Sequence, residues 1–261
     1  MKRVAVFGLA LAGAAAARAL VARGIDVVLS DDEIVDEHRR LARELGCAIV
    51  PVVTQSDVVA FLDGVDVLIP APGVPPLHRV IVEALACGVS VRSEIDIAYE
   101  WEQQRSGGPR PILGVTGTDG KTTTTMIAAA LLRGGGRTVG EVGNTDLPFM
   151  AAIDQSFDAF VVECSSFRLQ FTDTFRCDAS VWLNLAPDQT GLIPEKQVAA
   201  LKQLTEEIQT IFAVNLAEGA KIEADKTWGG GDPRFSAEKA LDGQQTTYWA
   251  GKDQDVTGTL T

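Results

Sequence analysis

The stretch "GVTGTDGKTTTT", residues 114–125, decides the fold because its glycines join an apolar run to a helical pattern. The apolar run begins at Ile112 and is typical of a buried strand. A helix is expected from Lys121 to Leu132, and the "GGG" that follows ends it. A glycine-rich loop between a strand and a helix presents backbone N–H groups to phosphate. The stretch therefore predicts an α/β fold with a nucleotide-binding loop.

The loop residues predict how a nucleotide triphosphate and Mg²⁺ would be held. We expect the N–H groups from Thr118 onward to face the phosphates, Lys121 to meet the outer phosphate oxygens, and the Thr122 hydroxyl to ligate the metal. Val115 departs from the strict G-x-x-x-x-G-K-[ST] pattern, because it stands where the first glycine belongs. The alternative is a plain turn with a helix cap. The residues assigned to the nucleotide are Gly117, Thr118, Asp119, Gly120, Lys121, Thr122 and Thr123.

Two polar residues beyond this loop join Lys121 as candidate catalytic residues. Glu163 ends the run "FDAFVVE", at the carboxyl edge of a predicted parallel sheet, where ligands bind. Its carboxylate is a candidate to hold a second Mg²⁺ or to orient the first, and an ordinary strand-end glutamate is the alternative. Asn144, in "GEVGNTDLP", is either a turn residue or an amide that reaches a carboxylate or phosphate.

The first hundred residues carry a second glycine loop of the same kind. "FGLALAG" follows the N-terminal strand, and Gly8 and Gly13 belong to a weakened dinucleotide-binding pattern. Asp31 and Asp32 end the next strand, about 20 residues on, where a carboxylate meets a ribose or a base. "APGVPP" around Gly73 would add a rigid backbone wall to the same crevice. The alternative is again a plain turn between a strand and a helix.

Alternating strands and helices predict a Rossmann-like domain over residues 1–105 and a partial P-loop domain over 110–188, joined by the linker "RSGGPRP". Residues 189–261 break this rhythm, with helical spacing over 194–212 and then short strands and turns. Helices are expected at 37–45, 56–62 and 76–87, and strands at 48–52, 65–70, 89–94, 157–164 and 177–185.

The composition of the chain argues against several classes of binding partner. The net charge of −12 argues against nucleic acids and anionic membranes. Four cysteines without a C-x-x-C pair suggest neither a zinc site nor a disulfide framework. His38 and His78, the only histidines, are expected at the surface rather than as metal ligands. The negative net charge does not exclude small anions as ligands that are bound locally.

The N-terminus has two interpretations. "MKRVAVFGLALAGAAAARAL" resembles a signal peptide, with a basic start, an apolar centre and small residues. It also fits a strand, a glycine turn and an alanine-rich helix before the strand "IDVVLSDD". The second interpretation, with no apolar run of about 18 residues or more, predicts a cytoplasmic protein, which we expect to be a monomer.

Six segments in order, "FGLALAG", "PAPGVP", "GVTGTDGKTTTT", "GEVGNTDLP", "VVECSSFRLQ" and "LNLAPD", resemble the Mur ligases of peptidoglycan synthesis and cell division. The match is to the branch that joins D-glutamate to UDP-N-acetylmuramoyl-L-alanine with ATP and Mg²⁺ through an acyl phosphate. The resemblance implies metal contacts from Thr122 and Glu163, besides the nucleotide and catalytic residues named above. It implies substrate contacts from Leu11, Ala12, Asp31, Asp32, Gly73, Asn144 and Ser165.

The resemblance covers residues 1 to about 188 and then stops. The family has a histidine after "LNLAPD" where this chain has Gln189, and its carbamylated lysine and adenine-contacting asparagine have no counterpart here. From Leu183 onward the chain instead resembles the C-terminal part of bacterial alpha-L-fucosidases. The sequence thus predicts a chimera joined near residues 183–189, with its ligase activity impaired. The alternatives are a non-catalytic nucleotide-binding chimera and a fragment of a carbohydrate-active protein.

Overall fold

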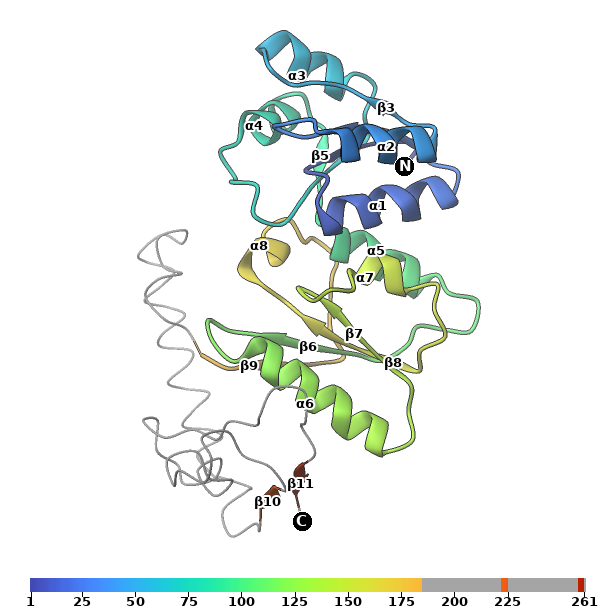
Figure 1. The fold of residues 1–261 in the computed structure, drawn as a ribbon, viewed down its shortest axis with the longest axis vertical. Helices are drawn as coiled ribbons and strands as arrows, with labels where there is room; N and C mark the ends of the chain where they lie inside the picture. The colour runs from blue at the N-terminus through green and yellow to red at the C-terminus, as the bar shows by residue number, and fades with distance from the viewer. Residues whose placement is uncertain (185–221, 225–257, 261) are drawn as a thin grey trace. The chain divides into compact units, whose positions relative to one another are not determined.

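The computed structural model describes residues 1–184, 222–224 and 258–260. Residues Met1–Leu185 form one compact unit and Ala186–Thr261 a second. In the second unit the described residues are two antiparallel strands, β10 (Ile222–Ala224) and β11 (Gly258–Leu260). The helix predicted over 194–212 lies outside the described residues. The first unit contains two parallel sheets (Figure 1).

The first sheet is doubly wound around β1, because the strands on its two sides are added in opposite directions. All its pairs are parallel, and its order is β3-β2-β1-β4-β5. β4 and the part of β1 from Val4 onward are apolar runs, and their side chains are buried. The strands are β1 (Arg3–Phe7), β2 (Asp26–Ser30), β3 (Ala48–Ile49), β4 (Val67–Pro70) and β5 (Ser90–Val91), and the helices are α1 (Leu11–Ala22), α2 (Asp36–Leu45), α3 (Gln55–Leu62) and α4 (Arg79–Ala86).

The second sheet is also parallel, in the order β7-β8-β6-β9. One face packs on α6, where Val115, Ala129 and Val161 form a small core. The other face contributes Phe160 and Val162 to the large core shared with the first sheet. The strands are β6 (Ile112–Thr116), β7 (Val139–Gly143), β8 (Ala159–Glu163) and β9 (Ala179–Trp182), and the helices are α6 (Lys121–Gly134), α7 (Phe149–Ala152) and α8 (Ser166–Leu169).

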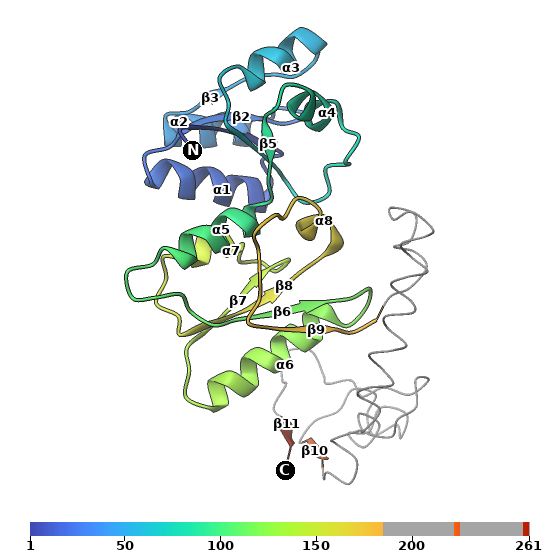
Figure 2. The ribbon, with the colours of Figure 1, turned by 180° about the vertical axis from the view of Figure 1, so that it is seen from behind.

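One helix, α5 (Glu94–Gln103), lies between the two sheets, with α7 beside it (Figures 1 and 2). Ile95 and Ile97 are fully buried in the shared core, which also contains residues of both sheets. Burial of each such side chain contributes roughly 1.5–3 kcal/mol. The two sheets are therefore packed against a common layer.

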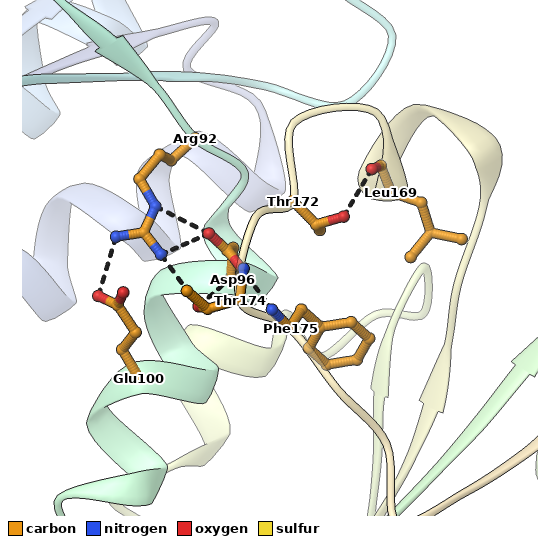
Figure 3. Close-up of polar contacts among 7 residues, drawn as sticks. All are labelled: Arg92, Asp96, Glu100, Leu169, Thr172, Thr174 and Phe175. Carbon is orange, nitrogen blue, oxygen red and sulfur yellow. Dashed lines mark hydrogen bonds and ion pairs between the residues drawn. The ribbon is translucent and has the colours of Figure 1, made fainter.

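A polar network ties α5 to the segment before β9 (Figure 3). Arg92 donates to the buried carboxylate of Asp96 through Nε at 2.8 Å and to Glu100 through Nη1 at 2.9 Å. The N–H groups of Thr174 and Phe175 donate to Asp96 at 2.8 and 2.6 Å. Burial by itself raises the pKa of Asp96, but these hydrogen bonds outweigh it and hold the pKa below its ordinary value.

The predicted linker is also anchored. Arg110 is buried, and its guanidinium donates to Glu102 through Nε at 2.9 Å and through Nη2 at 2.6 Å. The same side chain donates to the carbonyl oxygens of Ile153 and Gln155, at 2.5 and 2.7 Å. Pairing and hydrogen bonding together compensate the burial of these two charges.

The sequence predictions need three corrections. The strand predicted over 89–94 is shorter, because Glu94 already begins α5, a helix that the sequence analysis missed. The helix predicted from residue 76 begins at Arg79, since His78 caps it through its ring nitrogen. β7 was missed as well, because "VGEVG" contains glycines that favour a loop interpretation. Within the described residues, no helix is both long and apolar enough to span a bilayer.

Candidate active site

The loop after β6 needs glycine at two positions for different reasons. Gly117 has φ +144°, and a Cβ there would lie 3.0 Å from the Leu183 Cβ and 3.1 Å from the Asn184 nitrogen. Gly120 has φ +81° and is the N-cap of α6, a left-handed conformation that glycine adopts freely. The chain after β9 therefore packs directly on this loop.

Lys121, the first residue of α6, folds back over the loop. Its Nζ donates to the carbonyl oxygens of Gly117 and Thr118, both at 2.7 Å. The loop N–H groups also have internal partners, because Thr118 N donates to the Asn184 carbonyl at 3.2 Å and Asp119 N to its Oδ1 at 2.9 Å. A bound phosphate would take over some of these contacts. Asn184 is a contact that sequence reasoning missed, although it stands in "LNLAPD".

Glu163 and Asn144 meet at the carboxyl edge of the second sheet. Asn144 Nδ2 donates to Glu163 Oε1 at 3.0 Å, and the Asn144 backbone N–H donates to the Glu163 carbonyl at 2.9 Å. The Glu163 carboxylate is 1% exposed, and its Oε2 has no hydrogen-bond partner among the described residues. A buried carboxylate oxygen without a donor is costly, and a divalent cation, which prefers oxygen ligands, would satisfy it.

A pocket of about 510 Å³ opens beside these residues. It brings together three sequence-predicted residues: Leu11 from the start of α1, Thr122 from α6 and Asn144 from the end of β7. Arg168 also lines the pocket. Ser165, three residues before it, is the N-cap of α8, and its hydroxyl accepts the Arg168 backbone N–H at 3.4 Å. The other lining residues are Thr125, Met126, Glu141, Thr145 and Asp146. Thr123 is exposed and is not part of this wall.

The loop after β1 contacts a carboxylate, whereas the loop after β6 contacts a lysine. Leu9 N donates to Asp31 Oδ2 at 2.6 Å, so Asp31 supports the loop in this structure. Ala12 is buried, which leaves its backbone as the part available to a ligand, whereas Leu11 is 56% exposed. Gly73 is exposed with φ +96°. A groove of about 920 Å³ runs from this loop along α1 to α7.

The two histidines, predicted at the surface rather than as metal ligands, are only partly exposed. The His78 ring stacks on Phe7, with ring centroids 4.8 Å apart, and its Nε2 lies 3.1 Å from Asp32 Oδ1. His38 Nδ1 lies 4.0 Å from Asp31 Oδ2. Each side chain is 15% exposed. Both imidazoles pack against the acids at the end of β2, a tertiary arrangement that no local pattern indicates.

Comparisons with known proteins show which families this chain is similar to. Residues 115–219 match the Mur ligase middle domain. The chain is similar to the Mur ligases. It is 36% identical over 193 residues to the UDP-N-acetylmuramoylalanine--D-glutamate ligase of Syntrophus aciditrophicus, covering 73% of this chain and 41% of that one. With the enzyme of the same name from Thermobifida fusca it is 35% identical over 239 residues, covering 87% and 49%.

The fold is similar to that of a solved structure, the UDP-N-acetylmuramate:L-alanyl-gamma-D-glutamyl-meso-diaminopimelate ligase from Neisseria meningitides. The match has a TM-score of 0.46 and 20% sequence identity, and it covers 74% of this chain and 64% of that one. This chain spans less than half the length of the curated relatives, 41% and 49% for the two named above. The middle-domain match also runs through residues 189–219, past the predicted junction near 183–189.

Proposed function

We propose that the chain acts in an ATP-dependent amide ligation that joins D-glutamate to UDP-N-acetylmuramoyl-L-alanine through an acyl phosphate, releasing ADP and phosphate. The observation that carries this proposal is a pocket lined by Leu11, Thr122 and Asn144. Lys121 precedes Thr122 at the start of α6, and Glu163 accepts a hydrogen bond from Asn144. No nucleophilic side chain is required, because positioning and charge neutralisation supply the catalysis. The reaction belongs to peptidoglycan synthesis.

The nucleotide contacts follow from the loop after β6. Lys121 would exchange the carbonyl oxygens of Gly117 and Thr118 for oxygens of the outer phosphate, which carry full negative charge. The N–H groups from Thr118 to Lys121 lie at the N-terminus of a 14-residue helix, which favours an anion there. Gly117 and Gly120 give the loop its shape, and Asp119, Thr122 and Thr123 complete its contact surface.

Glu163 and Thr122 would hold Mg²⁺, whose charge would draw the phosphate and substrate oxygens together. The unpartnered Glu163 Oε2 supports this assignment. Asn144 positions the carboxylate through its 3.0 Å hydrogen bond to Oε1. Asn144 would thereby keep the free Glu163 oxygen directed at the cation.

The loop after β1 would hold the UDP-sugar. Its backbone at Leu11 and Ala12 opens a 12-residue helix, which suits a diphosphate, while Asp31 and Asp32 suit hydroxyl and base N–H groups. Gly73 adds backbone surface on the neighbouring strand's loop. Because Leu11 also lines the pocket beside Thr122, the substrate's far end would reach the nucleotide from here. Ser165, which caps α8 and accepts the N–H of the pocket residue Arg168, is the remaining proposed substrate contact.

ADP release tests this function. The full chain should release ADP with Mg²⁺-ATP, UDP-N-acetylmuramoyl-L-alanine and D-glutamate together, and only at background with any of them omitted. Lys121→Ala should abolish this release while leaving binding of the UDP-substrate unchanged. Absence of ADP above background, with ATP binding still measurable by calorimetry, would refute turnover.

A second candidate, nucleotide binding without turnover, rests on the internal contacts of the loop. Lys121 and the Thr118 and Asp119 N–H groups all have partners that a nucleotide must displace. ADP release separates the two candidates, because this one predicts none above background. It also predicts that the ATP affinity measured by calorimetry is the same with and without the UDP-substrate and D-glutamate.

The relation of the tail to alpha-L-fucosidases stays a prediction. The middle-domain match through residue 219 favours a continuous ligase sequence over a junction near 183–189. The coding DNA across residues 180–200 tests this, because an assembly error would disappear on resequencing. We also propose a cytoplasmic monomer, which light scattering of the purified chain and fractionation of the source cells would check.

A further inference from the structure

Arg168 is a buried cation whose position is fixed by the first half of the chain. It lies in α8, directly after β8, and is 5% exposed. Its Nη1 forms an ion pair with Oε1 of Glu94, a carboxylate that is 3% exposed at the start of α5. Glu94 Oε2 accepts the Met150 N–H at 3.0 Å. The guanidinium is therefore held at one end and cannot swing away without breaking a buried pair.

The other end of the guanidinium is unsatisfied. Arg168 Nε is buried and has no hydrogen-bond partner among the described residues. Arg168 also lines the 510 Å³ pocket, together with Leu11, Thr122 and Asn144. Buried N–H donors are nearly always paired, so an unpartnered donor in the guanidinium of a pocket-lining residue points to a ligand acceptor for that guanidinium.

The charges around the pocket define the acceptor. Glu94 offsets the charge of Arg168, and Arg133 offsets that of Glu141 on the same wall. Asp146 adds a further negative charge to the lining. In the proposed reaction Lys121 and the N–H groups of the loop after β6 meet the phosphates, so the small anion left for the charged N–H donor of Arg168 is the reacting carboxylate of the substrate.

We propose that Arg168, held by Glu94, binds through its guanidinium the carboxylate that the ligase activates, and so selects an acid over a neutral amide as substrate. This inference rests on the proposed function and adds a specificity residue to it. The carboxylate would arrive past Leu11, on the side of the pocket formed by α1, and meet Arg168 beside Asn144.

Calorimetry of the full chain with two ligands tests this. The ligands are UDP-N-acetylmuramoyl-L-alanine and its neutral L-alaninamide, which differ in one charge. A charge-assisted hydrogen bond predicts that the wild type binds the acid about 10-fold more tightly than the amide. Arg168→Gln should bring this ratio close to one by weakening the acid alone. Arg3→Gln, which removes a partly exposed guanidinium paired with Asp26 outside the pocket lining, should leave the ratio unchanged.

A second variant is needed because Arg168→Gln leaves the Glu94 carboxylate buried and unpaired, which destabilises the folded protein. The double variant Glu94→Gln with Arg168→Gln removes both charges and should also give a ratio near one, with amide affinity retained. An unchanged preference for the acid in either variant would overturn the inference, as would equal binding of both ligands by the wild type. In that last case the proposed function would survive, whereas a wild type that binds neither ligand would overturn both.

Discussion

The two glycine loops of this chain share a plan and differ in charge. Each follows a central parallel strand and opens a helix, α1 in one case and α6 in the other. After β1, the N–H of Leu9 is held by the carboxylate of Asp31, at 2.6 Å. After β6, the loop carries the ammonium of Lys121 and lies on the neutral side chain of Asn184. The two loops thus have the same backbone arrangement. We propose that the side chains that contact each loop determine which ligand it binds.

We propose on this basis that the loop after β1, supported by Asp31 and called here the acidic loop, binds the nucleotide sugar. The loop after β6, which carries Lys121 and is called here the basic loop, would bind the triphosphate. Variants that alter one loop should therefore leave the other ligand's affinity unchanged. The following predictions test this separation, in order of decreasing effect.

Glu163→Gln should have the largest effect. Loss of the carboxylate charge removes the proposed metal ligand at the basic loop, so the rate of ADP release should fall by about 100-fold or more. Steady-state assays over a Mg²⁺ titration measure it. Glu141→Gln is the matched control, since that carboxylate is partly exposed and paired with Arg133. Loss of UDP-substrate affinity in Glu163→Gln would contradict the separation.

Asp96→Asn should weaken the layer that supports both loops. Removing this buried charge leaves Arg92 with Glu100 alone, and the free energy of unfolding should fall by about 3 kcal/mol at pH 7. The folded pKa of Asp96 is below the unfolded value of about 3.9, so its stabilisation is present above that value and lost as pH falls through the folded pKa.

Urea unfolding at several pH values checks this. The difference between wild type and Asp96→Asn should shrink steadily below about pH 4. A difference that stays constant down to pH 2 would show that the Asp96 charge is not the source of the stabilisation.

Gly13→Ala should damage the acidic loop alone. A Cβ at Gly13 would lie 1.8 Å from the Gly8 carbonyl oxygen, so α1 must move away from β1 at a cost of about 1–3 kcal/mol. UDP-substrate affinity should fall with it, and ATP affinity should not. Gly134→Ala, at the end of α6 with open space around its Cβ, is the control and should be neutral or slightly stabilising.

Asp31→Asn should have the smallest effect. The amide oxygen still accepts the Leu9 N–H, but the hydrogen bond loses its charge, and UDP-substrate affinity should fall by about 5-fold. Competition binding with a fluorescent UDP derivative measures this. An equal fall in ATP affinity would show that the two loops are coupled.

The sequence was informative where chemistry is local. The start of α6 at Lys121 was predicted to the residue, because glycine and lysine mark the loop and the helix follows at once. α5 was missed although Ser93 and Asp96 fit the S-x-x-D pattern that begins helices. The strand-like run "VSVRSE" before it hid this signal.

The decisive side-chain contacts were beyond local patterns. Glu94 and Arg168 are 74 residues apart, and Asp119 and Asn184 are 65 apart. Such pairs depend on how the two sheets and α5 pack, which no short window of sequence contains. The sequence indicated that Asn144 is a candidate site residue. Its hydrogen bond to Glu163 could not be predicted, because it depends on the sheet register that places Gly143 opposite Glu163.

The most direct test of the central claim is a paired calorimetric titration of wild type and Lys121→Ala with Mg²⁺-ATP and, separately, with UDP-N-acetylmuramoyl-L-alanine. We predict that the wild type binds one equivalent of each ligand. Lys121→Ala should lose at least about 10-fold in ATP affinity, because one charge-assisted contact is removed, and keep its UDP-substrate affinity. Equal ATP affinity in both proteins, or loss of both ligands in the variant, would contradict the account.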